Sequence, residues 1–201
     1  MRVFVAGASG VMGLRVVPLL VQRGHEVVAM TRTPAKLDAL RALGATAVCC
    51  DVFDRAALIA AVGRVRPDAV VHQLTDLPDD AAELAGARAG NAAIREVGTD
   101  NLVDAAGRAG VDRLVAQSIA WLIDGERPSS VEHLERRTRA AGGVVLRCGQ
   151  WYGPGTYHEA APPPPPRVHV DAAARATVDA LDLAAGTYVV TDEGTIAAED
   201  A

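Results

Sequence analysis

Three glycines near the start of the chain have the spacing of a loop that binds phosphate groups. Gly7, Gly10 and Gly13 lie between an apolar run, Val3 to Ala6, and a segment whose apolar residues recur with the period of a helix. In such a strand–loop–helix the first glycine permits a tight turn, the second lets the backbone approach a pyrophosphate, and the third lets the helix pack closely on the strand. The helix N-terminus presents free amide groups to the anion. The spacing therefore predicts a dinucleotide-binding loop, and a glycine-rich turn without a ligand is the alternative. The expected contacts come from Gly7, Ser9, Gly10, Val11, Met12 and Gly13.

The residues that follow the second expected strand, near 26–30, indicate whether NAD or NADP is bound. An acidic side chain about twenty residues beyond the glycines would bind the ribose hydroxyls of NAD. The sequence there is Ala29-Met30-Thr31-Arg32-Thr33-Pro34, which contains no acid. The Arg32 guanidinium can hold the additional 2′-phosphate of NADP, with Lys36 one helical turn on as a second cation. We therefore expect NADP in preference to NAD; an ordinary exposed basic pair at a helix start is the alternative.

Short runs rich in β-branched residues alternate along the chain with amphipathic or alanine-rich segments. This alternation predicts an α/β fold in which helices cover both faces of a doubly wound parallel sheet of the Rossmann type. The ligand should bind at the carboxyl ends of the strands, where the strand order reverses. The expected strands lie near residues 2–6, 26–30, 45–50, 68–73, 112–117, 144–147 and 187–191. The expected helices lie near residues 11–23, 34–43, 54–64, 88–109, 128–140 and 170–182, with Asp54 as the cap of the third.

Length, charge and composition narrow the range of functions. The chain has 201 residues, half of them hydrophobic, which suits a single domain. Its net charge of −5 comes from interspersed acids and bases, so nucleic acid is not an expected partner. No apolar run approaches the ~20 residues of a membrane span, and the N-terminus enters a strand directly, so we expect a cytoplasmic protein. Three cysteines, two of them adjacent, fit reduced thiols better than a disulfide or a metal site.

Several later segments follow in the order known from one superfamily. The Gly-x-x-Gly-x-x-Gly spacing resembles that of the short-chain dehydrogenases/reductases, in particular their extended and atypical branches, the NAD-dependent epimerase/dehydratase-like proteins. The later segments that resemble this superfamily are Asp68–His72, Gly98–Leu102, Val111–Val115, Leu146–Gly155 and Val168–Asp171. The resemblance covers nearly the whole chain, and its specificity lies in the order of the segments.

The resemblance implies a small-molecule substrate and further contacts to the cofactor. Asp51 and Val52 occupy the place where the superfamily contacts the adenine. Leu74 and Thr75 should lie along the pyrophosphate and the nicotinamide ribose. Asp51 is explained comparably well as the cap of the next helix.

The catalytic residues are where the chain departs from the superfamily. Reductases of this superfamily use a tyrosine, a lysine four residues later that lowers the pKa of the tyrosine, and a serine that binds the substrate oxygen. The single lysine of this chain is Lys36, so no Tyr-x-x-x-Lys pair exists. The polar residues left to take part in catalysis are Ser118, Gln117 and Tyr152. A turn role for Ser118 and an apolar-wall role for Tyr152 are the alternatives.

The substrate-binding region of extended members is much reduced here. Residues 156–167 stand in its place and contain five consecutive prolines, Pro162–Pro166, which predict an extended, solvated connector. A second copy of the chain, in a homo-oligomer, or the connector itself could cover the opening. Three hypotheses remain: an NADP(H)-dependent oxidoreductase or epimerase, a catalytically silent nucleotide sensor or scaffold, or a non-redox isomerase, cyclase or lyase that reuses the pocket.

Overall fold

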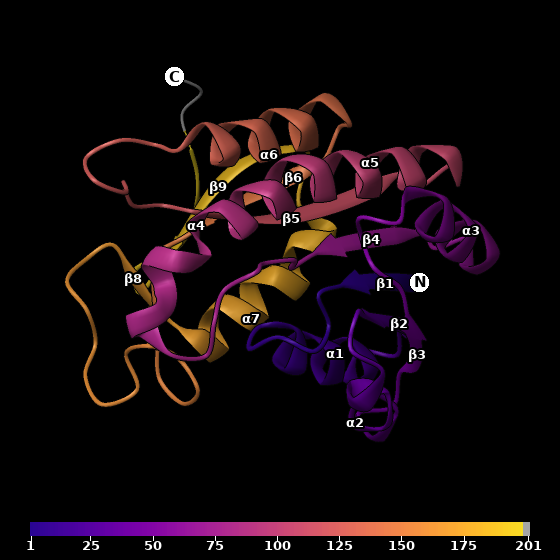
Figure 1. Cartoon of the computed structure of the whole chain (residues 1–201), viewed down its shortest axis with the longest axis horizontal. Helices are drawn as coiled ribbons and strands as arrows, with labels where there is room; N and C mark the ends of the chain where they lie inside the picture. Colours follow the sequence, from indigo (N-terminus) through magenta and orange to yellow (C-terminus); the bar gives the residue numbers. More distant parts are fainter. Residues whose placement is uncertain (199–201) are drawn as a thin grey trace.

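A mostly parallel sheet forms the middle of the computed structural model, which describes residues 1–198 (Figure 1). The strands are β1 (Arg2–Ala6), β2 (Glu26–Thr31), β3 (Thr46–Cys49), β4 (Ala69–His72), β5 (Arg113–Ile119), β6 (Val144–Cys148), β7 (Gln150–Tyr152), β8 (Arg167–His169), β9 (Gly186–Thr191) and β10 (Gly194–Ala197). The main sheet has the order β10-β9-β6-β5-β4-β1-β2-β3, and its neighbouring strands are parallel except for β9 and β10. A separate parallel pair joins β7 to β8. Because β1 lies between β2 and β4, the strand order reverses at β1, which confirms the expected doubly wound α/β fold.

Seven α-helices connect the strands of the described part of the chain. They are α1 (Gly13–Gln22), α2 (Leu37–Ala42), α3 (Arg55–Val65), α4 (Leu84–Ala93), α5 (Thr99–Arg108), α6 (Ser129–Ala140) and α7 (Val170–Asp179). Short 3₁₀ turns occupy Pro34–Lys36, Ala81–Glu83 and Ala180–Asp182, and a π-helical turn, Ile94–Gly98, joins α4 to α5. Of the helices within residues 1–198, none combines the length and the apolar character that crossing a membrane demands.

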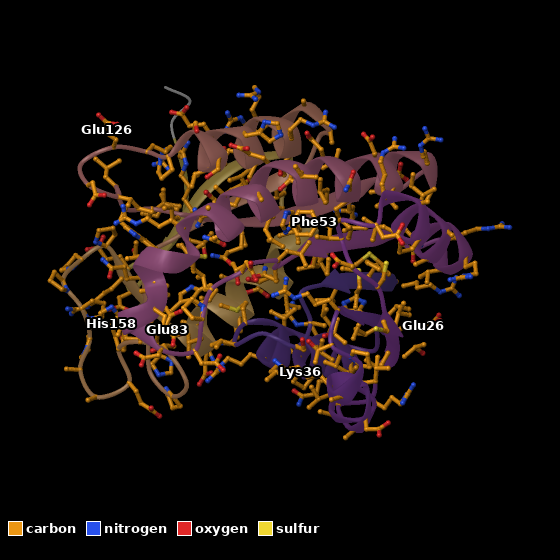
Figure 2. The ribbon with its side chains drawn as sticks, viewed as in Figure 1. Glu26, Lys36, Phe53, Glu83, Glu126 and His158 are labelled. Atoms are coloured by element: carbon orange, nitrogen blue, oxygen red, sulfur yellow. The ribbon has the colours of Figure 1, made fainter. Side chains whose placement is uncertain are left out.

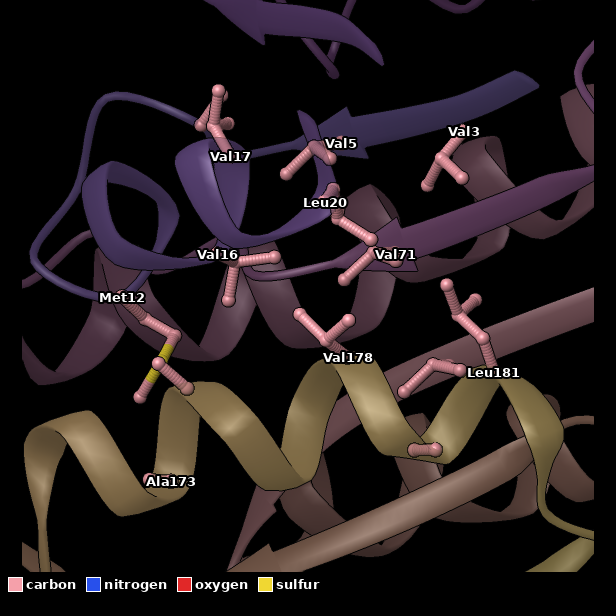
Figure 3. Packing of buried hydrophobic residues seen from close by; sticks show 14 of the residues in the cluster. Val3, Val5, Met12, Val16, Val17, Leu20, Val71, Ala173, Val178 and Leu181 are labelled. Atoms are coloured by element: carbon pink, nitrogen blue, oxygen red, sulfur yellow. The ribbon is translucent and has the colours of Figure 1, made fainter. Parts of the chain in front are cut away.

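Helices cover both faces of the main sheet. In Figure 1, α1 and α7 lie on one side, and α3, α5 and α6 lie on the other. Successive residues of β1 point to opposite faces, so Val3 and Val5 join the core under α1 and α7 whereas Phe4 joins the core under α3 and α5. Figure 3 shows the first of these cores, in which Val178 of α7 approaches Val16 of α1. Because valine, leucine and alanine fill this core, the two helices can pack closely.

The strands expected from the sequence are all present, and each of their ends lies within two residues of the expected position. The helix expected at 88–109 begins earlier, at Leu84, and contains the π-helical turn. The sequence did not predict β7, β8 or β10. β7 and β8 have only three residues each, too few for an alternating pattern to be recognised, and the four residues of β10 are all exposed, so no apolar run marks that strand.

The proline-rich segment is more closely packed than its composition indicates. Pro163 is buried, and its carbonyl oxygen accepts a hydrogen bond from Arg167 Nη1 at 3.0 Å. The Pro166 carbonyl accepts one from the amide of Gln150 at 2.9 Å, next to the pairing of β7 with β8. At the other end of the segment, the Tyr157 hydroxyl donates to the carbonyl of Pro78, in the loop after β4. The segment therefore connects two parts of the molecule instead of extending freely into solvent.

The start of α3 gives a first prediction. Asp54 precedes the helix, and its Oδ1 accepts a hydrogen bond from the amide of Ala57 at 2.9 Å, as expected from the sequence. We expect Asp54→Ala to lower the free energy of unfolding by about 1 kcal/mol, because one amide of the first turn loses its acceptor. Urea denaturation measures the change. Asp38→Ala is the matched control, since Asp38 makes only an exposed ion pair with Arg41 and should change stability by less than about 0.5 kcal/mol. Equal losses in the two variants would contradict the capping role.

Candidate functional site

The glycine loop follows β1 at the carboxyl end of the sheet, and its first and third glycines are fixed by close packing. Gly7 has a φ of +85°, and a Cβ there would lie 2.5 Å from the carbonyl oxygen of Gln73. A Cβ on Gly13 would lie 2.4 Å from the carbonyl oxygen of Ala8. Both positions therefore exclude any side chain. Gly10 differs, because a Cβ there would meet only the Gly7 oxygen, at 3.6 Å, so the outer side of the loop is open at this residue.

Hydrogen bonds to β2 hold the loop in place. The amide of Ala8 donates to the carbonyl of Met30 at 3.0 Å, and the hydroxyl groups of Ser9 and Thr31 lie 2.8 Å apart. The same Thr31 oxygen accepts a hydrogen bond from the amide of Thr33. The Ser9 side chain is therefore used to fasten the loop, and the loop is held in one shape by the protein itself.

Three consecutive amide groups where the glycine loop enters α1 are available for an anion. The amides of Leu14, Arg15 and Val16 donate to backbone carbonyls of the loop. Within residues 1–198, the structure records no such bond for the amides of Val11, Met12 and Gly13. The Met12 side chain is buried in the core, so only its backbone can contact a ligand. Free amides at a helix N-terminus, beside an open glycine, fit the pyrophosphate of a dinucleotide.

The two cations expected near the adenosine end both lie after β2. Arg32 is exposed, and its Nη2 forms an ion pair with Oδ1 of Asp76 at 2.5 Å. Asp76 belongs to the loop after β4, so this pair spans the strand between β2 and β4. Lys36 is exposed near the start of α2 (Figure 2). Both side chains lie on the β2 side of the glycine loop, as expected from their positions after the second strand.

The turns after β3 and β4 are held by side chains of their own. Asp51 Oδ1 accepts a hydrogen bond from the amide of Phe53 at 2.9 Å and so shapes its own turn, while the cap of α3 is Asp54. Val52 is buried, and its carbonyl accepts a hydrogen bond from Asn101 Nδ2. Adenine contacts from Asp51 and Val52 stay predictions.

A buried histidine fixes the turn after β4. His72 Nδ1 accepts from the amide of Leu74 at 3.2 Å, and its Nε2 lies 2.9 Å from the Thr99 hydroxyl. Burial, with a smaller contribution from Arg95, lowers the pKa of His72 to about 4, so the ring is neutral at physiological pH. Leu74 is half-buried and Thr75 is exposed. The contacts predicted for these two residues stay predictions.

The three candidate catalytic residues do not converge on one point. Ser118 is buried, and its hydroxyl donates to Glu135 Oε1 of α6 at 2.6 Å. Gln117 is the preceding residue of β5 and therefore points to the opposite face of the sheet. The Tyr152 hydroxyl donates to Asp192 Oδ1 at 3.1 Å, in the turn between β9 and β10. The hydroxyls of Ser118 and Tyr152 are thus both engaged by carboxylates of the protein.

Glu135 forms the most buried charged cluster of the described residues. Arg147 binds it with two hydrogen bonds, from Nε to Oε1 at 3.0 Å and from Nη2 to Oε2 at 2.6 Å. Arg127 Nη1 lies 3.4 Å from Oε1. Burial alone would raise the pKa of Glu135, but the hydrogen bonds from Arg147 and Ser118 and the nearby positive charges lower it below its usual value. This cluster links α6 to β5 and β6 and includes the Ser118 hydroxyl; a catalytic role for Ser118 stays a prediction.

Asp192 organises the region around Tyr152. Besides the Tyr152 hydroxyl, it accepts from the amide of His169 at 3.2 Å and from Arg167 Nε at 3.1 Å. The rings of Tyr152 and His169 pack edge to face, with their centroids 5.2 Å apart. Burial and the hydrogen bond to Asp192 raise the pKa of Tyr152, so the phenol keeps its proton. Lys36, on the far side of β1 from this region, does not take the place of the missing catalytic lysine.

Sequence reasoning did not find the carboxylates that engage these residues. Asp76, Glu135 and Asp192 each lie between 17 and 44 residues from the group that they bind. Residue spacing along the chain does not predict pairs of side chains that are this far apart in sequence. Asn91 of α4 is buried, and its Oδ1 accepts a hydrogen bond from the amide of Asp76 at 3.1 Å.

Comparisons of the sequence with known proteins agree with a nucleotide-binding role for the glycine loop. A family model described as NAD(P)H-binding matches residues 7–142, from the glycine loop to the end of α6. A 3-diazoavenalumate denitrifying reductase from a Streptomyces species is 42% identical over 184 residues, covering 78% of this chain and 58% of the relative. The chain thus spans little more than half the length of that curated relative.

Solved structures share the fold across nearly the whole chain. The UDP-glucose 4-epimerase of Thermus thermophilus, solved with NAD, has a TM-score of 0.78 and 22% identity, and the match covers 98% of this chain and 79% of the epimerase. A Bordetella bronchiseptica enzyme solved with NAD+ has a TM-score of 0.73 and 24% identity, with coverages of 98% and 77%. At these identities the likeness establishes the Rossmann-type fold and no finer property.

Proposed function

Because the chain belongs to the NAD(P)H-binding family, we propose that it is a reductase that uses NADPH to reduce a small electrophilic molecule. The observation that carries this proposal is the glycine loop, which is open at Gly10 and leads into α1 through the free amides of Val11, Met12 and Gly13. These amides would hold the pyrophosphate, and the cofactor when bound would supply a hydride from its nicotinamide ring. The groups of the protein would bind and orient the two reactants.

The finer proposal, a preference for NADPH over NADH, depends on Arg32. Its exposed guanidinium follows β2, and the segment Ala29–Pro34 itself contains no acid that could bind the ribose hydroxyls. We expect Arg32→Ala to weaken NADPH binding about tenfold, because one charge-assisted contact to the 2′-phosphate is lost, and to leave NADH binding nearly unchanged. Fluorescence titration of both nucleotides measures the effect. Arg41→Ala, which removes an exposed arginine of α2 that is paired with Asp38, is the matched control. An equal loss for NADH would remove the phosphate assignment.

The engaged hydroxyls favour a reduction in which the protein donates no proton. Ser118 and Tyr152 already donate to carboxylates, and the sequence has no Tyr-x-x-x-Lys pair. Reduction of a ketone would need a proton for the oxygen that receives the charge. Gln117 makes only a long contact, 3.5 Å from its Nε2 to the Ser118 carbonyl, so its amide is the candidate best able to bind a substrate. We assign Gln117 to substrate binding, and Ser118 and Tyr152 to positioning their neighbours.

The name of the Streptomyces relative describes a reduction of this kind. It is a denitrifying reductase of a diazo compound that is also a carboxylate. When a hydride adds to the carbon of an aryl diazonium ion, a C–H bond forms, the C–N bond breaks, and its electron pair leaves with N₂. Atoms and charge balance without a proton. We infer that aryl diazonium carboxylates, or electrophiles that likewise accept hydride without a proton, are the substrate class of this chain.

A substrate panel tests the proposed activity. NADPH oxidation would be followed with an aryl diazonium carboxylate, an aldehyde and a ketone, and NADPH deuterated at the transferred position would show whether deuterium enters the arene. We expect enzyme-dependent turnover with the diazonium compound above the rate without enzyme, and none with the ketone. We also expect Tyr152→Phe to keep this turnover within about twofold, because the reaction needs no proton from the protein. If the wild type reduced the ketone and Tyr152→Phe abolished that reduction, the proposal would be overturned. Tyr152 would then be a proton donor.

The engaged hydroxyls also support a second candidate, a nucleotide sensor without catalysis. A sensor would bind NADPH tightly and oxidise it with no member of the panel. Failure to bind either nucleotide would exclude both functions.

A further inference from the structure

We propose that Asp76 sets how strongly this chain prefers NADPH, because its carboxylate competes with the 2′-phosphate for Arg32. This inference rests on the proposed role of Arg32 in binding that phosphate. Arg32 comes from the end of β2 and Asp76 from the loop after β4, and the two meet with Nη2 and Oδ1 2.5 Å apart. The strand between β2 and β4 is β1, which leads into the glycine loop. The ion pair therefore lies beside the region that would receive the adenosine end of the cofactor.

The backbone of Asp76 is held by α4. The buried side chain of Asn91 accepts a hydrogen bond from the Asp76 amide at 3.1 Å. At Gly90, a Cβ would lie only 2.5 Å from Asp76 Oδ2. Any other residue at position 90 would thus displace the carboxylate. Asn91 thus anchors the backbone of Asp76, and Gly90 leaves the space that its carboxylate occupies beside Arg32.

The charges of Arg32 and Asp76 affect the binding of NADPH and of NADH differently. The side chain of Asp76 is one-third exposed, so its charge is only partly screened by solvent. A 2′-phosphate that approaches Arg32 must either replace this carboxylate or bind next to it, and both cost free energy. NADH has no 2′-phosphate and does not meet this cost. Asp76 therefore reduces the preference for NADPH that Arg32 alone would give.

Binding of four nucleotides to Asp76→Asn tests the inference. NADPH and NADH, together with adenosine 2′,5′-bisphosphate and AMP, would be titrated calorimetrically into the full chain. The second pair isolates the 2′-phosphate. We expect Asp76→Asn to tighten binding of NADPH and of the bisphosphate about fivefold, and to change binding of NADH and AMP by less than about 1.5-fold. In Arg32→Ala/Asp76→Asn the gain should vanish, because the two side chains act through one interaction.

Asp79→Asn is the matched control. It removes the same charge from the same loop, and Asp79 is exposed and makes no ion pair with Arg32 among the described residues. A gain of equal size in Asp79→Asn, or an equal gain for NADH, would show a general effect of charge and overturn the inference. Weaker NADPH binding in Asp76→Asn would also overturn it, since Asp76 would then be presenting Arg32 to the phosphate. If Arg32→Ala weakens NADPH binding while Asp76→Asn changes nothing, this inference fails and the proposed role of Arg32 stands. If Arg32→Ala has no selective effect, both fail.

Discussion

Glu135→Ala lowers the free energy of unfolding by about 3–5 kcal/mol, the loss expected when one partner of a buried ion pair is removed. Glu135 is 2% exposed and binds Arg147 through both carboxylate oxygens. Without it, the guanidinium of Arg147 loses two hydrogen bonds in a partly buried position, and the hydroxyl of Ser118 loses its acceptor. Urea denaturation at neutral pH measures this change.

Two comparisons keep this prediction specific. Glu132→Ala removes an exposed carboxylate from the same helix and should change stability by less than about 0.5 kcal/mol. Glu135→Gln keeps the size of the side chain and an acceptor for Ser118, so its loss should fall between those of the two alanine variants. If Glu135→Ala and Glu132→Ala were equally stable, the cluster would not be holding α6 to the sheet.

The same cluster gives a pH dependence. The Arg147 and Ser118 hydrogen bonds outweigh burial and lower the pKa of Glu135 in the native protein. The unfolded chain therefore binds this proton more tightly, so the stability that Glu135 contributes is complete above its ordinary pKa of 4.5 and is lost as the pH falls through the lower native pKa. Between pH 5 and pH 3, on the order of the range where carboxylates titrate, the wild type should lose more stability than Glu135→Gln. Parallel losses would contradict the assignment.

Gly10→Val abolishes cofactor binding and leaves stability nearly unchanged. A Cβ at position 10 meets only the Gly7 oxygen, at 3.6 Å, so we expect the fold to accommodate a side chain there. The added methyl groups occupy the space through which the pyrophosphate must reach the free amides of Val11, Met12 and Gly13. We expect a loss of about 100-fold or more in NADPH affinity, which corresponds to about 2.7 kcal/mol. Calorimetric titration and urea denaturation of the same preparation separate the two effects.

Substitutions at two other glycines, one in the loop and one in α3, serve as comparisons for Gly10→Val. Gly7→Ala forces a Cβ against the backbone of Gln73 and requires a φ of +85°, so it should lose both stability and binding. Gly63→Val, in α3, has nothing within 4 Å of its Cβ and should not change NADPH binding. Tight NADPH binding by Gly10→Val would show that the pyrophosphate does not pass over this loop.

The sequence predicted the fold well because its signals are local. Hydrophobic runs, glycines and the Asp54 cap act within a few residues of one another, and these signals located all seven strands that were expected. The short strands β7 and β8 were missed because a strand of three residues carries no periodicity of its own. They depend on each other and on Asp192, which lies about forty residues beyond Tyr152.

The candidate site was predicted only in part, for the opposite reason. The glycine loop, Arg32 and Lys36 are recognisable from residue type and spacing. What each polar side chain binds depends on contacts between distant segments. Ser118 has a suitable hydroxyl for catalysis, but the structure directs that hydroxyl to Glu135, and no local pattern predicts the pairing.

The packing of Gly7 against Gln73 has a consequence for the chain as it leaves the ribosome. The Ala6 carbonyl accepts its hydrogen bond from the amide of Gln73, so the turn that begins the glycine loop is completed by a residue 67 positions later than Ala6. A nascent chain that ends before β4 contains all three glycines and α1 but lacks the surface on which the loop rests. Such a chain cannot yet gain stability from the nucleotide. We therefore expect a bound nucleotide to protect the protein only after β4 has paired with β1.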